Sequence, residues 1–309
     1  MKQYTSLYFV GAGGIGMSAL VRYFLAKGYK VAGYDRTQSP LTTELKTEGL
    51  EIVYEESVES IPDYCRNPET TLVVYTPAIP ASHAGLVYFR EHGFRVVKRA
   101  ELLGLITQSS KGLCFAGTHG KTTTSSMAAH IFHESPIGCN AFLGGILRNY
   151  NSNLILSEQS PFTVIEADEY DRSFHWLHPY MAVVTATDPD HLDIYGTEEA
   201  YLESFAHFTS LIQPGGCLIM KKGIKLVPSV KENVKIYTYS ARDGGDFHAG
   251  NIRIGDGTIV FDFVMPEGSV ADIELGVPVE INIENAVAAM AIAWLNGVSG
   301  NDMRRAMAS

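Results

Sequence analysis

The sequence feature that most constrains the fold is a glycine-rich turn at residues 117–124, which reads Gly-Thr-His-Gly-Lys-Thr-Thr-Thr. It follows a short apolar run at 112–116 and precedes a segment at 125–132 that is expected to be helical. In a strand, turn and helix of this kind, backbone N–H groups and the helix N-terminus surround a polyphosphate, a Lys neutralises it, and a Thr hydroxyl ligates Mg²⁺. The turn therefore predicts nucleotide-dependent phosphoryl chemistry in an α/β domain.

From Gly117 to Thr122 this turn is contracted relative to the eight-residue phosphate-loop signature, which would have Gly at the position of Phe115. A short turn of this composition also occurs as a simple chain reversal without any ligand. The run of threonines at 122–124 and the flanking strand favour the phosphate site over that structural alternative.

A second glycine turn lies near the N-terminus, at 11–16. An apolar strand at 6–10 precedes it, a helix at 19–27 follows, and a further strand at 29–34 ends at Asp35. This is the dinucleotide-binding fingerprint in the strand–turn–helix context that it requires. An acidic residue is placed to accept a hydrogen bond from a ribose hydroxyl. Such a turn binds the pyrophosphate of NAD, FAD or a UDP-sugar alike, and its glycines alternatively serve only tight helix–strand packing.

Strands and helices continue to alternate after the first turn. Helices are predicted at 41–48, at 84–92 and from 99 onward, and strands at 51–54, 71–76 and 95–97. This alternation predicts a Rossmann-like parallel sheet with its ligand at the carboxyl ends of the strands. A chain of 309 residues favours two domains. The polar break at 108–111 divides them into 1–109 and 110–309.

Two strands of the second domain end in acidic residues. The strand that begins at 162 reaches Glu166, Asp168 and Glu169, and the strand at 181–186 leads to an Asp-Pro-Asp-His-Leu-Asp segment at 188–193. A single Asp-rich segment of this kind is usually a solvated capping loop. Two of them beside a phosphate loop indicate coordination of a hard cation, because parallel strands deliver their ends to one edge of the sheet.

The rest of the second domain is less specific. A glycine loop is expected at 140–145, a turn and strand at 215–219, a strand at 258–264, and an Ala-rich, fully buried helix at 282–294. The strand at 258–264, bounded by turns on both sides, predicts a β-rich edge to the domain.

Composition excludes several functional classes. The net charge is −10 and no long basic run occurs, which argues against nucleic acid as a partner. No apolar run is long enough to insert into a membrane. The four cysteines are far apart and lack metal-type pairs, so they are expected to be reduced thiols. Together these features predict a soluble, cytoplasmic protein.

Three motifs together, at 11–18, at 117–124 with 166–169, and at 190–193, resemble those of the Mur ligases, which build the peptidoglycan peptide. The resemblance covers essentially the whole chain. It implies that the first turn holds the diphosphate of a UDP-sugar rather than NAD, and that a P-loop-type central ATPase domain holds ATP and Mg²⁺. It also implies a third, C-terminal domain that binds the incoming amino acid, and the sequence ends before such a domain.

The resemblance assigns roles to individual residues. The UDP-sugar would be bound by Gly11, Gly13, Gly14, Ile15, Gly16, Met17, Ser18 and Asp35. ATP would be bound by Gly117, Thr118, His119, Gly120, Lys121, Thr122, Thr123 and Asn282. The metal ligands would be Thr122, Glu166 and His191, and the catalytic residues Lys121, Glu166 and His191.

The activity that the resemblance implies is ATP-dependent amide ligation: a substrate carboxylate becomes an acyl phosphate, which an amino group then attacks. Ile281 stands where the family's adenine-side motif has His. The segment 201–212 lacks the Lys that members acting at several later steps carbamylate, which favours the branch that joins L-alanine to UDP-N-acetylmuramate. Without the third domain, the chain is expected to bind UDP-N-acetylmuramate but to be inactive alone as a ligase.

Three alternatives to this activity stay open. A recycling ligase would attach a preformed peptide to the same sugar. An NAD-dependent oxidoreductase would use the turn at 11–16 and Asp35, although it would leave the second nucleotide loop unexplained. A non-catalytic nucleotide-binding regulator would use both turns without chemistry.

Overall fold

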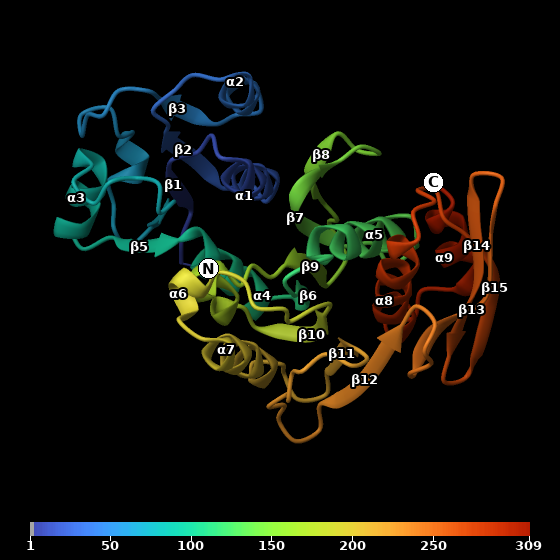
Figure 1. Cartoon of the computed structure of the whole chain (residues 1–309). Coiled ribbons are helices and arrows are strands. Elements are labelled where there is room, and N and C mark those ends of the chain that lie inside the picture. Colours follow the sequence, from blue (N-terminus) through green and yellow to red (C-terminus); the bar gives the residue numbers. More distant parts are fainter. Residues whose placement is uncertain (1–2) are drawn as a thin grey trace. The chain divides into compact units, whose positions relative to one another are not determined.

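The computed structural model describes residues 3–309 and divides into two compact units. Unit 1 comprises 1–106 and 144–154, and unit 2 comprises 107–143 and 155–309. Each unit is built on a sheet that is wholly or mainly parallel, so the predicted α/β class is confirmed (Figure 1). The sequence-based border between residues 109 and 110 stays a prediction, and it does not anticipate that 144–154 belongs with unit 1.

Unit 1 contains a five-stranded parallel sheet in the order β3-β2-β1-β4-β5. Its strands are β1 Ser6–Val10, β2 Lys30–Tyr34, β3 Glu51–Val53, β4 Thr71–Tyr75 and β5 Arg95–Lys98. Because β2 and β4 flank β1 on opposite sides, the strand order reverses at the carboxyl end of β1. Such a switch point is where open α/β sheets bind ligands, and Gly11 starts the first glycine turn there.

The helical segments of this part of the chain are α1 Ile15–Ala26, α2 Pro40–Thr47, η1 Asp63–Cys65, α3 Ala84–Glu91 and α4 Arg99–Gln108. The start of α1 was predicted four residues too late. Gly14 is extended (φ −71°, ψ 144°), and helical geometry begins directly after it. The glycine turn and the helix therefore adjoin, which brings the N-terminus of α1 to the end of β1.

Unit 2 is built around a ten-stranded sheet in the order β15-β14-β13-β12-β11-β10-β6-β9-β7-β8. The strands of this sheet are β6 Lys111–Ala116, β7 Asn140–Leu147, β8 Ser152–Ile155, β9 Phe162–Glu166, β10 Pro179–Val184, β11 Cys217–Lys221, β12 Lys235–Ser240, β13 Phe247–Gly255, β14 Thr258–Met265 and β15 Gly268–Glu274. The second half of β7 and most of β8 fall in the segment 144–154, which is assigned to unit 1. The pairs around β6 are parallel, whereas β13, β14 and β15 are antiparallel neighbours. The expected β-rich edge is this antiparallel part, and the strand predicted at 258–264 is β14.

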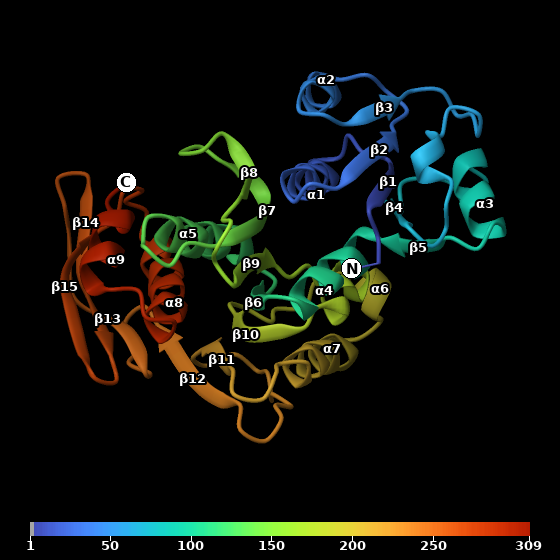
Figure 2. The ribbon, with the colours of Figure 1, turned by 180° about the vertical axis from the view of Figure 1, so that it is seen from behind.

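The helical segments of unit 2 are α5 Lys121–His133, η2 Tyr170–Trp176, α6 Leu192–Tyr195, α7 Glu198–Ser210, α8 Ile281–Leu295 and α9 Gly300–Met307. The predicted Ala-rich helix is α8, and its side chains from 285 to 293 are all buried. Helices α5, α8 and α9 lie side by side (Figures 1 and 2). Between residues 3 and 309 no helix combines the length and the apolar character needed to cross a bilayer.

The glycine loop expected at 140–145 is wrong, because this segment is the first part of β7. Residues 140–142 pair with β9, and 140–143 are buried. Neither Gly144 nor Gly145 has a positive φ, so both continue the extended chain instead of turning it. The turn and strand expected at 215–219 are confirmed: Gly215 turns the chain with a φ of 85°, and β11 begins at Cys217.

The four cysteines are buried free thiols, as the sequence predicted. Burial raises the pKa of Cys65, Cys139 and Cys217 to about 12, and it raises the pKa of Cys114 as well. At neutral pH these thiols stay protonated, so they act as small apolar side chains of the core and not as nucleophiles.

Candidate functional site

The second glycine turn connects β6 to α5 and is closed tightly. Gly117 has a φ of 139° and Gly120 a φ of 84°, so both are in conformations that favour glycine. A Cβ on Gly117 would lie 2.2 Å from Thr185 Oγ1, which leaves no room for a side chain. The Thr185 hydroxyl lies within 2.5 Å of the His119 carbonyl oxygen, while the His119 side chain itself is exposed. The predicted loop is therefore a compact backbone cradle.

The N-terminus of α5 carries no side-chain cap. Its N-cap is Gly120, and the Thr124 N–H is bonded to the Gly120 carbonyl at 2.9 Å. The N–H groups of the first helical turn, at 121–123, therefore have no partner within the helix. Together with the positive end of the helix dipole, they form an anion site of the kind that binds phosphate. Thr122 and Thr123 are exposed at this end of the helix.

Lys121 is the first residue of α5, and its ammonium group folds back over the loop. Nζ donates to the Gly117 carbonyl at 2.7 Å and lies 2.9 Å and 2.7 Å from Oε1 and Oε2 of Glu169. The Lys121 side chain is 14% exposed and that of Glu169 is 2% exposed. Sequence reasoning placed Glu169 in an acidic strand end but did not pair it with this lysine.

Thr122 meets Glu166, which is the last residue of β9. The Thr122 hydroxyl donates to Glu166 Oε1 at 2.9 Å. Since β9 is the parallel neighbour of β6, both strands end at the same edge of the sheet, as the motif analysis required. A hydroxyl and a carboxylate oxygen are hard ligands, and this pair fits one side of a divalent metal site.

His191 is the third predicted metal ligand, and it is the N-cap residue of α6. Within residues 3–309 no group of three or more His, Cys, Asp or Glu side chains is assembled closely enough to hold a metal ion. His191 caps α6 with a φ of 52°, and its ring lies edge-on to Tyr170 with 5.2 Å between centroids. Its Nε2 is 3.8 Å from Asp190 Oδ2. Its role as a ligand stays a prediction.

Thr118 is held by a residue that sequence reasoning missed. Its hydroxyl donates to the Asp188 carbonyl at 2.7 Å and lies 3.0 Å from the hydroxyl of Tyr201 on α7. Because Thr118 has only one hydroxyl proton, Tyr201 is the donor of the second bond. Burial raises the pKa of Tyr201, so this proton is retained. No sequence signal distinguishes Tyr201 from an ordinary core tyrosine.

The asparagines of α8 approach the loop from the other side. Asn282, which the motif analysis assigned to ATP, donates to the Val277 carbonyl and accepts from Asn285, both at 3.3 Å. Asn285 accepts a 3.2 Å hydrogen bond from Thr124, and its Oδ1 would lie 3.0 Å from a Cβ on Gly120. Asn285 therefore touches the phosphate loop directly, while Asn282 orients Asn285.

In unit 1, Asp35 holds the first glycine turn closed. The Gly13 N–H donates to Asp35 Oδ2 at 2.7 Å, and the Thr37 N–H donates to Oδ1 at 3.2 Å. A Cβ on Gly13 would lie 2.8 Å from Asp35 Oδ2. Gly11 has a φ of 92°, and its Cβ would lie 2.5 Å from Thr76. The ribose contact assigned to Asp35 stays a prediction, beside this structural role.

The N-terminus of α1 resembles that of α5 in lacking a side-chain cap at Gly14. Ile15 is 53% exposed, whereas Met17 and Ser18 are buried and the Ser18 hydroxyl donates to the Ile15 carbonyl at 2.7 Å. The predicted sugar-diphosphate residues thus separate into an open face at 14–16 and two interior residues, Met17 and Ser18.

Two residues outside the fingerprint complete this face. A Cβ on Gly16 would lie 2.9 Å from Arg99 Nη1, so the guanidinium of α4 lies against the turn. The buried Asn153 amide donates to the Ile15 carbonyl at 2.8 Å. Neither residue belongs to a recognisable motif, and Asn153 comes from the segment 144–154 that joins unit 1 from later in the chain.

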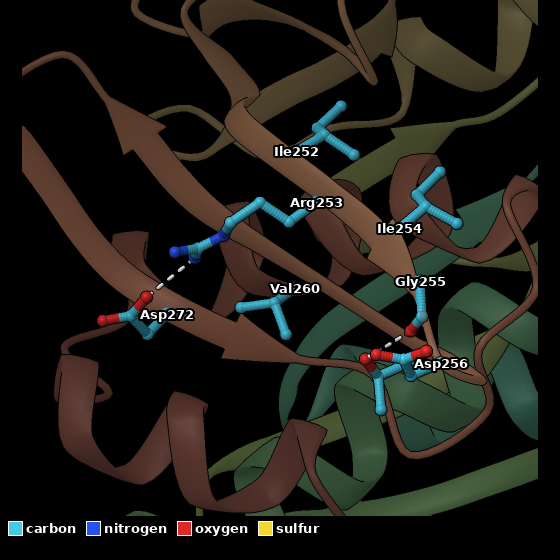
Figure 3. A pocket seen from close by; sticks show the side chains of 8 residues that line it. Ile252, Arg253, Ile254, Gly255, Asp256, Val260 and Asp272 are labelled. Atoms are coloured by element: carbon cyan, nitrogen blue, oxygen red, sulfur yellow. Dashed lines mark hydrogen bonds and ion pairs between the residues drawn. The ribbon is translucent and has the colours of Figure 1, made fainter.

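Away from both glycine turns, an open hollow lies on the antiparallel part of the unit 2 sheet (Figure 3). Its lining includes Ile252, Ile254, Val260 and the ion pair between Arg253 and Asp272, whose atoms are 2.7 Å apart. None of the residues predicted from the motifs lines it. The two glycine turns therefore remain the candidate functional sites.

Comparisons with known proteins match each glycine turn to a different family model. Residues 6–111 match the model of the Mur ligase family, catalytic domain, and residues 115–293 match the Mur ligase middle domain. A protein of Parabacteroides distasonis named UDP-N-acetylmuramate--L-alanine ligase is 66% identical over 309 residues, which is 100% of this chain and 67% of the relative. One of Porphyromonas gingivalis with the same name is 55% identical over 98% of this chain and 67% of its own.

The same fold occurs in solved structures. A UDP-N-acetylmuramate:L-alanyl-gamma-D-glutamyl-meso-diaminopimelate ligase of Neisseria superposes with a TM-score of 0.84 at 21% identity, covering 99% of this chain and 98% of its own. A UDP-N-acetylmuramate-alanine ligase of Thermotoga maritima gives 0.79 at 23% identity, covering 98% and 67%. The chain spans about two thirds of the length of the curated relatives it matches. With both domain models matched and a 66% identical relative along its whole length, the chain belongs to the Mur ligase family.

Proposed function

We propose that this chain provides the UDP-sugar and ATP sites of a ligase that joins L-alanine to the lactyl carboxylate of UDP-N-acetylmuramate in peptidoglycan biosynthesis. The observation that carries the proposal is the 66% identity, over the whole chain, to a relative named for this reaction. The uncapped N-terminus of α5 beside Lys121 supports the nucleotide half of the proposal on physical grounds.

In this reaction the γ-phosphoryl group of ATP passes to the substrate carboxylate, and the amino group of L-alanine then displaces phosphate from the acyl phosphate. The protein needs to position the reactants and neutralise charge, because phosphoryl transfer requires no protein nucleophile. We assign Lys121 to the β- and γ-phosphates and the N–H groups at 121–123 to their oxygens. Asn285 and Tyr201 hold the loop in shape from either side.

Mur ligases use ATP with a divalent metal, and we propose Mg²⁺ for this chain. The Thr122 hydroxyl and the Glu166 carboxylate, 2.9 Å apart at the mouth of the loop, are the ligands that fit it best. When bound, the metal withdraws negative charge from the phosphate oxygens and the acyl group. His191 would join them from the start of α6.

For unit 1 we propose that the open face at 14–16 holds the diphosphate of UDP-N-acetylmuramate. The uncapped N-terminus of α1 offers N–H groups to the phosphates, and the Arg99 guanidinium lies against the turn. Cationic help is needed here, because the only charged residue within the fingerprint is the acidic Asp35.

The relatives at 55–66% identity carry the L-alanine ligase name, and this favours L-alanine over the preformed peptide of a recycling ligase. The likeness to the Neisseria ligase is at 21% identity and reflects the fold alone. We place the reaction in the cytoplasm. We also propose that these 309 residues bind both nucleotides but ligate slowly, because the relatives contain a further third of sequence that this chain does not match.

Two measurements test the proposal. Isothermal titration of the chain with UDP-N-acetylmuramate and with MgATP is expected to show binding of both. Lys121→Met is expected to remove MgATP binding and to leave binding of UDP-N-acetylmuramate unchanged. Amino acid-dependent phosphate release, measured on a protein of the relatives' length with Ala, Ser, Gly and a tripeptide, is expected to be highest with L-alanine and to fall about 10²–10³-fold in Lys121→Met. No binding of the UDP-sugar at millimolar concentration would refute the assignment of unit 1.

A further inference from the structure

We propose that Glu169 is a built-in counter-ion of the phosphate loop, which nucleotide phosphates displace from Lys121, and that its charge makes the site prefer metal-bound over metal-free nucleotide. The inference rests on the proposed function, in which Lys121 contacts the β- and γ-phosphates. It adds a positioning and selectivity role for a carboxylate that is neither a proposed metal ligand nor part of the loop.

The contacts of Lys121 show that its charge is already neutralised. An ammonium group has three donor protons, and Lys121 Nζ has three partners within 3 Å: the Gly117 carbonyl and both oxygens of Glu169. Glu169 Oε2 makes no hydrogen bond besides this ion-pair contact among residues 3–309. A phosphate oxygen can therefore gain Lys121 only by displacing one of these three contacts, two of which belong to Glu169.

The backbone of Glu169 is held more firmly than the lysine side chain. The Tyr195 hydroxyl donates to the Glu169 carbonyl at 2.5 Å, and the Arg172 N–H donates to the same oxygen at 3.0 Å. The next turn contains two non-glycine residues at positive φ, Asp171 and Arg172, which is a conformation that only a fixed environment maintains. When nucleotide binds, the flexible four-carbon stem of Lys121 moves toward the phosphates, while Glu169 stays near its present position.

This exchange leaves a negative charge close to the phosphates. The Glu169 side chain is 2% exposed, so water screens its charge weakly. Metal-free ATP, with its full charge, is repelled most by the carboxylate. A divalent cation on the phosphates reduces that repulsion, so Glu169 discriminates between the two forms of the nucleotide.

An ion pair with a purely structural role makes a different prediction. If Glu169 only stabilised the fold or fixed the Lys121 rotamer, its loss would weaken binding of both nucleotide forms by the same factor. The ratio of the two dissociation constants therefore separates the roles, and it does not depend on catalytic activity.

The experiment compares dissociation constants by isothermal titration, for ATP in EDTA and for MgATP, in the wild-type chain and in Glu169→Gln. We expect metal-free ATP to bind about tenfold more tightly to Glu169→Gln, equivalent to about 1.4 kcal/mol, with a change of less than about threefold for MgATP. The matched control is Asp272→Asn, which removes one negative charge and one ion pair from the same unit in the hollow of Figure 3. Its ratio is expected to equal that of the wild type.

Glu169→Asp covers the case in which the glutamine variant does not fold. It draws the carboxylate back by one methylene group, so metal-free ATP is expected to gain affinity in the same direction but by a smaller factor. Equal weakening of both nucleotide forms, or an unchanged ratio, in whichever of the two variants folds would overturn the inference. Lys121→Met distinguishes the two levels of the argument: undiminished nucleotide binding in that variant refutes the proposed function of the loop itself.

Discussion

Replacing Gly117 by alanine tests whether the phosphate loop is closed as tightly as its geometry indicates. Gly117 has a φ of 139°, and an added Cβ would lie 2.2 Å from Thr185 Oγ1 and 2.8 Å from the Ala186 nitrogen. Holding an alanine in such a conformation costs about 1–3 kcal/mol, and relieving overlap in a packed region costs about 1–3 kcal/mol more. We therefore expect unit 2 to lose about 2–6 kcal/mol of unfolding free energy in Gly117→Ala.

Tryptophan fluorescence in urea measures this loss of unfolding free energy in unit 2. The two tryptophans, Trp176 and Trp294, both lie in unit 2. With a urea dependence of about 2 kcal/mol per molar, a loss of about 4 kcal/mol lowers the unfolding midpoint by about 2 M. MgATP binding, measured on folded protein at low urea, is expected to weaken as well, because the loop N–H groups are displaced.

The matched control is Gly223→Ala in the same unit. Gly223 also has a positive φ, 86°, but nothing lies within 4 Å of its added Cβ. It is expected to cost only the conformational penalty of about 1–2 kcal/mol. If the midpoint of Gly117→Ala falls no further than that of Gly223→Ala, the loop relaxes around a side chain and the cradle argument is wrong.

Three further substitutions test unit 1. Arg99→Ala is expected to weaken UDP-N-acetylmuramate binding about tenfold without changing MgATP binding, since a charged donor is lost from the first turn; unchanged titrations with the sugar would contradict this. Asn153→Ala removes the buried hydrogen bond to the Ile15 carbonyl and is expected to lower the local unfolding free energy by about 1–3 kcal/mol. Amide hydrogen exchange at 15–18 is then expected to be faster, and unchanged exchange there would show that the bond is dispensable. His83 caps α3 by accepting from the Leu86 N–H at 3.3 Å, and burial lowers its pKa. Below about pH 6.5 the His83 side chain binds a proton more readily in the unfolded chain than in the folded one, so the free energy of unfolding falls as pH falls. The urea midpoints near pH 7.5 and pH 5.5 should therefore differ less in His83→Asn than in wild type. Equal differences in the two proteins would refute the role of His83 as a cap.

The parts of the fold and site that sequence analysis predicted correctly are those with local causes. Alternating apolar runs predicted the parallel strands β1, β2, β4 and β6, and glycine spacing located both turns at their carboxyl ends. The contact between Thr122 and Glu166 also follows from local rules, because adjacent parallel strands end at one edge. In each case the deciding pattern lies within one strand and the turn that follows it, although two such strand ends can meet from 44 residues apart, as Thr122 and Glu166 do.

The residues that sequence analysis missed act across long separations. Tyr201 reaches Thr118 from 83 residues away, and Asn285 reaches Thr124 from 161 residues away. Tyr201 resembles an ordinary buried helix residue in type and spacing, so no periodicity or motif marks it. Asn285 stands in the segment 278–285 that resembles the family's adenine-side motif, but that resemblance does not indicate its contact with Thr124. The strand β7 was missed because its local sequence is misleading. Two glycines suggested a turn, whereas pairing with β9 keeps the segment extended.

Asp35 shows how far a fingerprint determines its ligand. In a dinucleotide site, the acid at the end of the second strand accepts the ribose hydroxyls. Here Asp35 accepts from the Gly13 N–H with Oδ2 and from the Thr37 N–H with Oδ1, so a ribose hydroxyl would share an oxygen that already accepts one bond. The same carboxylate adds negative charge next to the turn that we propose binds a diphosphate, and the guanidinium of Arg99 lies against Gly16 on that turn. We therefore propose that the balance between Asp35 and Arg99 sets the preference of the first turn for its ligand, and glycine spacing alone does not contain this information.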